Sequence, residues 1–243
     1  MCAVPLSAMA DPTADLDVLA DKRALRAIPI HDRPKPRMRG RLHQGAFIAS
    51  IPAGLVLVLL APDARSRIAT SIYAITLCGL FGVSAAYHLG DWSPAAYARM
   101  RRLDHSMIFV LIAGTYTPFC LLVLQGTLAT VVLVAVWAGA AVGVATKCYR
   151  VDLHVLSGFM YVGLGWLVIV SLPALLRGLD AAETVLVLAG GLLYSIGALS
   201  LATNKPNPWP HTFGYHEVWH AATIAAAACQ YGSVLLVVLG LPA

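Results

Sequence analysis

Residues 216–241 read HEVWHAATIAAAACQYGSVLLVVLGL: two histidines four positions apart, followed by a long apolar run. A helix needs about 20 predominantly apolar residues to cross the hydrocarbon core of a bilayer, so this run predicts a transmembrane helix. Residues four apart lie on one face of a helix, one turn from each other. The sequence therefore predicts two neighbouring imidazoles at the start of a span, in a His-Glu-x-x-His pattern known from zinc sites.

The rest of the chain has the composition of a polytopic membrane protein. Of its 243 residues, 59% are hydrophobic and 12% are charged, whereas soluble domains carry about 25% charged residues. The net charge of +5 does not indicate a nucleic-acid partner, because the basic residues fall in short loops beside apolar runs. The five cysteines are scattered without a C-x-x-C pair, so we expect small apolar fillers and no disulfide framework.

Seven apolar segments predict an all-α membrane protein, a bundle of seven transmembrane helices at residues 42–243. A polar and basic tail at residues 1–41 precedes it, and Asp15–Ile28 can form a short amphipathic helix there. Prolines inside the segments are expected to kink the helices without ending them. The predicted spans are about 43–61, 67–89, 104–124, 127–146, 154–176, 182–202 and 215–240, and the prolines are Pro52, Pro118 and Pro173.

The orientation follows from the distribution of lysine and arginine between the short loops. With the N-terminus in the cytoplasm, the inner segments carry eleven of these residues and the outer loops carry three, namely Arg65, Arg67 and Arg177. We therefore predict a cytoplasmic N-terminus and an external C-terminus. The expected location is the bacterial inner (plasma) membrane, with multiple passes.

Five polar residues are predicted at the cytoplasmic ends of three helices. His88 ends the second span, and Ser84 lies one turn deeper on the same face. Asp104 opens the third span, and His216 and His220 open the seventh. Ionisable groups inside spans are costly and usually face the bundle interior, where they mark a function. We predict that these five side chains meet at one depth.

Three imidazoles can hold one Zn²⁺ ion and leave a fourth coordination position for water. Zinc makes that water a nucleophile near neutral pH. In this hypothesis His88, His216 and His220 are the metal ligands, Asp104 is the general base and Ser84 stabilises a developing oxyanion. Such a site can cleave an amide or ester at the inner leaflet, so membrane lipids are the expected partners.

Each position also has a purely structural interpretation. Asp104 can pair with Arg101 or Arg102, Ser84 can be a small packing residue, and the histidine pair can be a polar helix start. Glu217 leaves another alternative, because the Glu of soluble His-Glu-x-x-His proteases is the general base. Histidines outside the set are interpreted as residues at headgroup level: His43, His105, His154 and His211.

Four motifs, in order along the chain, resemble the hemolysin III family. This family is the bacterial branch of the progestin and adipoQ receptor family, and it is more distantly similar to the alkaline ceramidases. The resemblance runs from about residue 40 to the C-terminus. It departs from the family at residues 41–45, which read RLHQG where members commonly carry an acidic residue and Thr-His. The motifs are SAAYH at 84–88, RRLDHSMIF at 101–109, AGTYTP at 113–118 and FGYHEVWH at 213–220.

The resemblance implies seven helices, an inside N-terminus and a zinc ion bound by His88, His216 and His220. It also implies that Asp104 holds the metal-bound water, with Ser84 close by. Eukaryotic members are lipid- or hormone-linked receptors with reported ceramide hydrolysis, and bacterial members are named hemolysins.

These observations leave several functions open. The first is a zinc-dependent, ceramidase-like hydrolase whose substrate is ceramide or another fatty-acyl amide; an intramembrane protease with Asp104 as an acidic ligand ranks below it. The second is a receptor or sensor with structural zinc. The third is a cytolysin, although a pore needs a continuous polar path and the outer halves of the spans are nearly bare of charge. Bis-histidine haem is a further alternative. A retinal protein is excluded, because no lysine follows Lys205.

Overall fold

The computed structural model describes residues 35–150 and 153–242. The chain divides into two compact units, Met1–Lys35 and Pro36–Ala243, and all of the described helices belong to the second unit. The predicted amphipathic helix at Asp15–Ile28 and nearly all of the predicted 1–41 tail lie outside the described residues.

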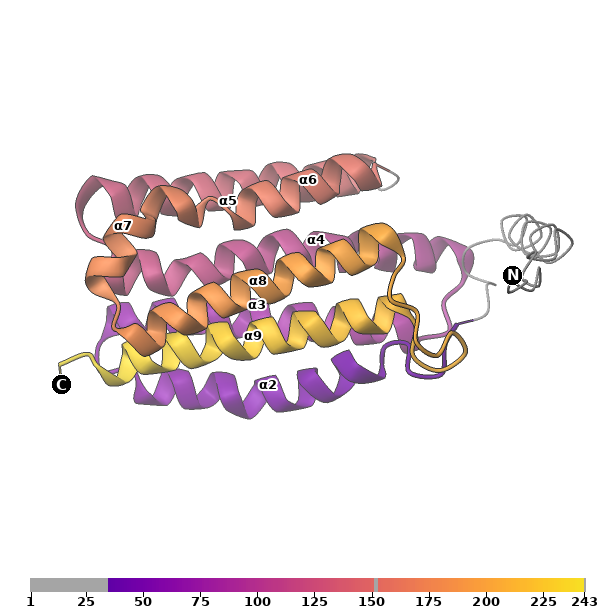
Figure 1. Cartoon of the computed structure of the whole chain (residues 1–243), viewed down its shortest axis with the longest axis horizontal. Coiled ribbons are helices and arrows are strands. Elements are labelled where there is room, and N and C mark those ends of the chain that lie inside the picture. Colours follow the sequence, from indigo (N-terminus) through magenta and orange to yellow (C-terminus); the bar gives the residue numbers. More distant parts are fainter. Residues whose placement is uncertain (1–34, 151–152, 243) are drawn as a thin grey trace, which may run out of the picture. The chain divides into compact units, whose positions relative to one another are not determined.

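Seven helical spans run alternately in opposite directions (Figure 1). Each is long and apolar enough to cross a membrane, and no strand occurs in residues 35–150 and 153–242. This confirms the predicted all-α bundle of seven spans, whereas its direction of insertion stays a prediction. The spans are α2 (Arg41–Leu60), α3 (Ala64–Leu89), α4 (Pro94–Pro118) with the π-helix η2 (Phe119–Val123), α5 (Gly126–Tyr149), α6 (His154–Gly165) with α7 (Val168–Gly178), α8 (Ala181–Thr203) and α9 (Tyr215–Leu239).

The outward faces of the spans are apolar. Large side chains such as Leu59, Val155 and Phe159 leave about 70% or more of their surface exposed, at 71%, 75% and 73%, and soluble monomers rarely show extensive apolar patches. Tyr73 and Phe109 are fully buried in the core between the helices. Such a distribution suits a bundle that is surrounded by hydrocarbon.

Capping side chains mark the starts of α3 and α4. α4 begins at Pro94, ten residues before the predicted 104, because Ser93 caps it by accepting a hydrogen bond from the Ala96 N–H. The apolar pattern marks only the part of this helix that suits hydrocarbon, so it misses the polar first turns. α3 begins after Asp63, which accepts a hydrogen bond from the Ser66 N–H at 2.8 Å. That bond lowers the pKa of the Asp63 carboxyl.

The fifth span is broken in its middle, a feature that the hydrophobic pattern does not predict. α6 ends at Gly165 and α7 begins at Val168. The Tyr116 hydroxyl of α4 donates to the carbonyl oxygen of Gly165 at 2.7 Å, so a carbonyl at the break is satisfied without water. As predicted, Pro52 and Pro173 do not end their helices, since α2 and α7 continue through them. At Pro118 the α-helix α4 ends, and the span continues as the π-helix η2.

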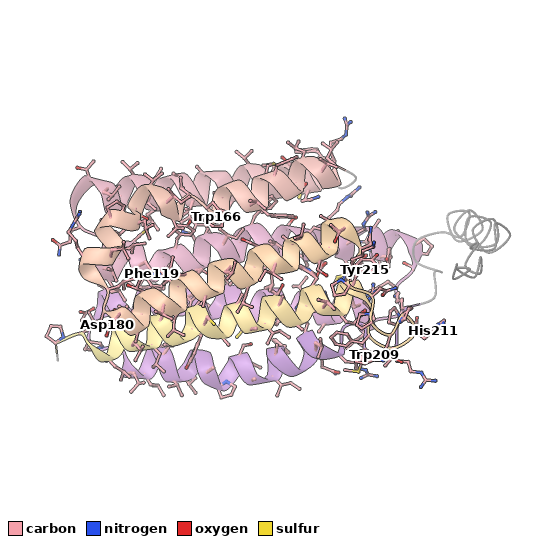
Figure 2. The ribbon with its side chains drawn as sticks, in the orientation of Figure 1. Phe119, Trp166, Asp180, Trp209, His211 and Tyr215 are labelled. Atoms are coloured by element: carbon pink, nitrogen blue, oxygen red, sulfur yellow. The ribbon has the colours of Figure 1, made fainter. Side chains whose placement is uncertain are left out.

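One end of the bundle, called the histidine end below, is where α2, α4, α6 and α9 begin and α3, α5 and α8 end. Tyr215, Trp209 and His211 lie at this end, and Asp180 lies at the opposite one (Figure 2). α2 packs against both α3 and α9, and α3 also contacts α9. The end of α3 and the start of α9 are thus brought together beside the start of α2.

Candidate metal centre

Three imidazoles meet at the histidine end. His88 lies in the last turn of α3, and His216 and His220 lie in the first two turns of α9. One ring nitrogen from each lies within 4.8 Å of those of the other two. The Nε2 atoms of His88 and His216 are 3.2 Å apart. The predicted convergence of the second and seventh spans is therefore present in the described structure.

The spacing of one pair of these nitrogens, from His88 and His216, matches that of two zinc ligands. Zinc binds imidazole nitrogen at about 2.0–2.1 Å with tetrahedral geometry, which separates two ligand nitrogens by about 3.3 Å. The observed separation between His88 and His216 is 3.2 Å. His220 is buried, and the other two are half-buried, so the group is shielded from bulk water on most sides. Three neutral donors in this arrangement leave a tetrahedral ion one open position.

Asp104 of α4 contacts α3 one helical turn before His88. Ser84 lies one turn before His88 on α3, is buried and donates its hydroxyl hydrogen bond to Asp104. Ser84 and His88 are one helical turn apart, so Asp104 meets α3 one turn before a candidate ligand. Asp104 is not a member of the imidazole group itself.

Glu217 lies between the two histidines in sequence but has a different set of contacts. Its side chain is fully buried, and one oxygen is paired with the Arg39 Nε. The other oxygen accepts a hydrogen bond from the Gly214 N–H at 2.8 Å, which caps the start of α9. Both oxygens are thus engaged in holding the helix start, which the His-Glu-x-x-His pattern alone does not reveal.

The segment Pro36–Gly40, called the strap below, crosses the histidine end just before α2. The Arg37 and Met38 N–H groups donate to the carbonyl oxygens of His211 and Thr212, at 3.0 and 3.1 Å. Gly40 has a φ of 80°, and a Cβ on it would lie 2.8 Å from the His88 Cβ. The strap therefore lies against the α8–α9 loop and directly beside a candidate ligand. No pattern in the sequence signals these contacts.

The interpretation of His43 as a headgroup-level residue is wrong. Its side chain is only 3% exposed, and its ring stacks on that of His220 with centroids 3.7 Å apart. His211 is exposed on the α8–α9 loop, as expected, and His105 is half-buried. The side chain of His154 lies outside the described residues.

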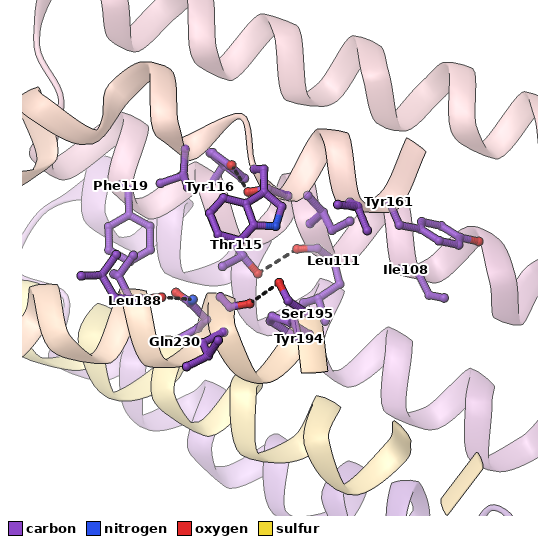
Figure 3. A pocket seen from close by; sticks show the side chains of 18 of the residues that line it. Ile108, Leu111, Thr115, Tyr116, Phe119, Tyr161, Leu188, Tyr194, Ser195 and Gln230 are labelled. Atoms are coloured by element: carbon purple, nitrogen blue, oxygen red, sulfur yellow. Dashed lines mark hydrogen bonds between the residues drawn. The ribbon is translucent and has the colours of Figure 1, made fainter. Parts of the chain in front are cut away.

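An apolar cavity of about 240 Å³ lies between α4, the fifth span, α8 and α9 (Figure 3). Trp219 and Thr223, which flank His220 in the sequence of α9, are among the residues that line it. Three polar groups in its wall donate to backbone carbonyls: Thr115 donates to Leu111, Ser195 to Gly191 and Gln230 to Val187. Most of the other lining side chains are apolar, so the cavity offers an occupant a largely hydrocarbon wall.

Comparisons with known proteins agree with this architecture. The family described as haemolysin-III related matches residues 31–231. Hemolysin-3 of Bacillus cereus is 34% identical over 201 residues, which cover 81% of this chain and 89% of the relative. A hemolysin-3 homolog of Bacillus subtilis (strain 168) is 32% identical over 204 residues, covering 82% and 92%. The human monocyte to macrophage differentiation factor is 26% identical over 198 residues, covering 79% of each chain. No solved structure matches.

Proposed function

This chain belongs to the haemolysin-III-related family and is an integral multi-pass membrane protein, and we propose that it is a zinc-dependent hydrolase of lipid amides or esters. The observation that carries the proposal is the meeting of three imidazole nitrogens within 4.8 Å of one another, in a bundle whose surface is otherwise apolar. Family membership supports the fold, whereas the proposed reaction rests on the residues of the site.

His88, His216 and His220 are proposed to hold the metal through their ring nitrogens. A zinc ion held by three imidazoles supplies an open coordination position and activates water for attack on a carbonyl carbon near neutral pH. The protein supplies the placement of the ligands: α3 provides one, and two turns of α9 provide the others. Burial of His220 keeps bulk water from competing for the site.

Asp104 is proposed as the general base. Its carboxyl accepts a proton from the attacking water and passes it to the leaving nitrogen or oxygen as the carbon–nitrogen or carbon–oxygen bond breaks. Ser84 donates a hydrogen bond to this carboxyl. We therefore propose Ser84 as a positioning residue that orients Asp104. The earlier expectation that Ser84 stabilises an oxyanion would require that hydroxyl to leave Asp104.

Glu217 is a poor candidate for the base. Its two oxygens are paired with Arg39 and with the Gly214 N–H, and the side chain is fully buried. Freeing it would leave Arg39 without its ion-pair partner and would uncap α9, and each of these losses costs stability. Of the two carboxylates considered, Asp104 therefore fits the role.

The cavity favours a substrate with a hydrocarbon chain. It is lined by apolar side chains such as Leu111, Phe119 and Leu188, and its hydroxyl and amide groups are committed to backbone carbonyls (Figure 3). An alkyl chain gains contacts there without leaving a buried polar group unpaired. Trp219 and Thr223, which line the cavity, flank His220 in the sequence of α9. An amide or ester carbonyl at the end of the alkyl chain is proposed to reach the imidazoles from there. Ceramide and other fatty-acyl amides have this form.

The test is an assay of purified, zinc-loaded protein in detergent on ceramides, other fatty-acyl amides and fatty-acyl esters. We expect turnover of at least one of these classes, and an Asp104→Asn variant that keeps its zinc but loses at least about 100-fold in kcat. Asp91→Asn, an exposed carboxylate in the loop before α4, is the matched control and should behave as wild type. Zinc-loaded protein without turnover, or an Asp104→Asn variant with unchanged turnover, would overturn the proposal.

The alternatives make different predictions. A receptor or sensor with structural zinc would lose thermal stability when the metal is removed, but would show no Asp104-dependent turnover. The names of the Bacillus relatives concern haemolysis, which is a statement about those proteins. A pore needs a polar path through the bundle, and the core away from the histidine end contains residues such as Leu57, Phe119 and Val234.

A further inference from the structure

His43 is a buried polar side chain with no evident structural use. It lies in the first turn of α2 and is 3% exposed. Neither of its ring nitrogens has a hydrogen-bond partner in the part of the chain that the structure describes. Burying an unpaired polar group costs about 1–3 kcal/mol, a cost that an apolar side chain of similar size would avoid. A histidine at this position therefore calls for an explanation in terms of its ring.

The ring of His43 is packed face to face against a candidate ligand. Its plane is 6° from that of His220, and the ring centroids are 3.7 Å apart. Phe81 of α3 packs near His43 in a tilted arrangement, with centroids 5.2 Å apart. α2, α3 and α9 thus place the imidazole of His43 next to both Phe81 and His220.

His220 has different neighbours in the candidate metal centre. The rings of His216 and His88 are tilted against it, with centroids at 4.5 and 5.2 Å. The outer torsion of a histidine side chain has a broad preference, so nothing intrinsic to the residue fixes the direction of its nitrogens. A flat ring stacked on one face restricts rotation about this torsion, because rotation would drive the ring edge into its neighbour.

We propose that His43 is a positioning residue, whose flat face holds the His220 ring so that a ring nitrogen is directed at the other two imidazoles. The inference rests on the proposed zinc site. His43 is not itself a member of the ligand group, which comprises His88, His216 and His220. A metal binds imidazole in the plane of the ring, and two parallel rings direct their nitrogens along parallel planes, not toward one shared point.

The test uses variants of His43 that separate three possible contributions to zinc binding: the flat ring face, the ring nitrogens and the side-chain volume. His43→Phe keeps a flat ring without nitrogens, whereas His43→Leu fills the space without a flat face. The zinc dissociation constant is measured by competition with a chromophoric chelator, and the cobalt-substituted protein gives a ligand-field spectrum that reports ligand geometry. His211→Leu, on the exposed loop, is the control for a lost histidine.

We expect His43→Phe to bind zinc within about 3-fold of wild type, a change of about 0.65 kcal/mol. His43→Leu should bind about 10- to 100-fold more weakly, as is typical when support for a ligand is lost, with a shifted cobalt spectrum. Without metal, the two variants should unfold at similar temperatures, at or above that of the wild type, because neither buries an unpaired ring nitrogen. Wild-type affinity in His43→Leu would overturn the proposal, and so would equal losses in both variants, because the ring face would then not be the cause.

A metal-free measurement distinguishes this inference from the proposed function. In histidine-labelled protein, ring-current shifts in the NMR signals of His220 should appear in wild type and His43→Phe and disappear in His43→Leu. Their absence in wild type would overturn the stacking and with it the positioning role. A wild type that shows the stack but binds no zinc would instead overturn the proposed function.

Discussion

The helices that carry the imidazoles are packed far more closely than the fifth span. In the apolar stretch of α3, 56% of residues are buried, against 11% in the fifth span, α6 with α7. α9 is intermediate at 44%. A site that must hold ligands within a fraction of an ångström needs side chains locked by their neighbours. The difference places the candidate metal centre on the tightly packed side, with the cavity between it and the loosely packed span.

The buried ion pair between Arg39 and Glu217 gives the largest expected effect on the packed side. Arg39→Leu leaves a fully buried carboxylate without its partner, and we expect a loss of about 3–5 kcal/mol in the free energy of unfolding. Chemical unfolding in detergent measures it. Arg99→Leu, at an exposed position on α4, is the control and should stay within about 0.5 kcal/mol of wild type. Equal effects of the two changes would contradict the role of the pair.

Two phenylalanines compare a tightly packed position on α4 with an exposed position on the fifth span. Phe109 is fully buried against Gly143, and Phe159 of α6 is 73% exposed. Phe109→Ala should cost about 3 kcal/mol, the low end for such a change, because lipid is as apolar as the core and packing contacts account for most of the loss. Phe159→Ala should change stability by less than about 0.5 kcal/mol. Thermal unfolding of both variants measures the difference. A larger loss of stability in Phe159→Ala than in Phe109→Ala would contradict the prediction.

Replacing two glycines by alanine should change the free energy of unfolding in opposite directions. Gly40 has a φ of 80°, and an added Cβ would lie 2.8 Å from the His88 Cβ. Gly40→Ala is therefore expected to cost about 1–3 kcal/mol and to weaken zinc binding through displacement of His88. Gly158 is helical in α6 and has no neighbour within 4 Å of such a Cβ, so Gly158→Ala should stabilise the protein by up to about 1 kcal/mol. Unfolding midpoints of both variants test this, and the same sign for both would contradict it.

The seven spans could be predicted from the sequence because membrane helices need long apolar runs, and every run here is bounded by polar residues or turn signals. The convergence of His88 with His216 and His220 was also predictable. Once the topology alternates, the end of the second span and the start of the seventh lie on the same side of the membrane. Helix periodicity then places His216 and His220 on one face.

Other features depend on tertiary contacts that carry no local pattern. The start of α4 was missed because its first turns are polar, and the break after Gly165 because the apolar run continues through it. His43 looks like any histidine near a helix start until α2 is packed against α9. Glu217 belongs to a catalytic pattern by sequence, and only the position of Arg39 reveals its role in capping and pairing.

The central claim, that His88, His216 and His220 hold one zinc ion, is tested most directly by metal analysis of the purified wild type and a His220→Ala variant. The account predicts about one zinc per chain in the wild type, as expected for a three-histidine site, and almost none in the variant. Wild-type protein that retains no zinc, or a His220→Ala variant that retains as much as wild type, would contradict it.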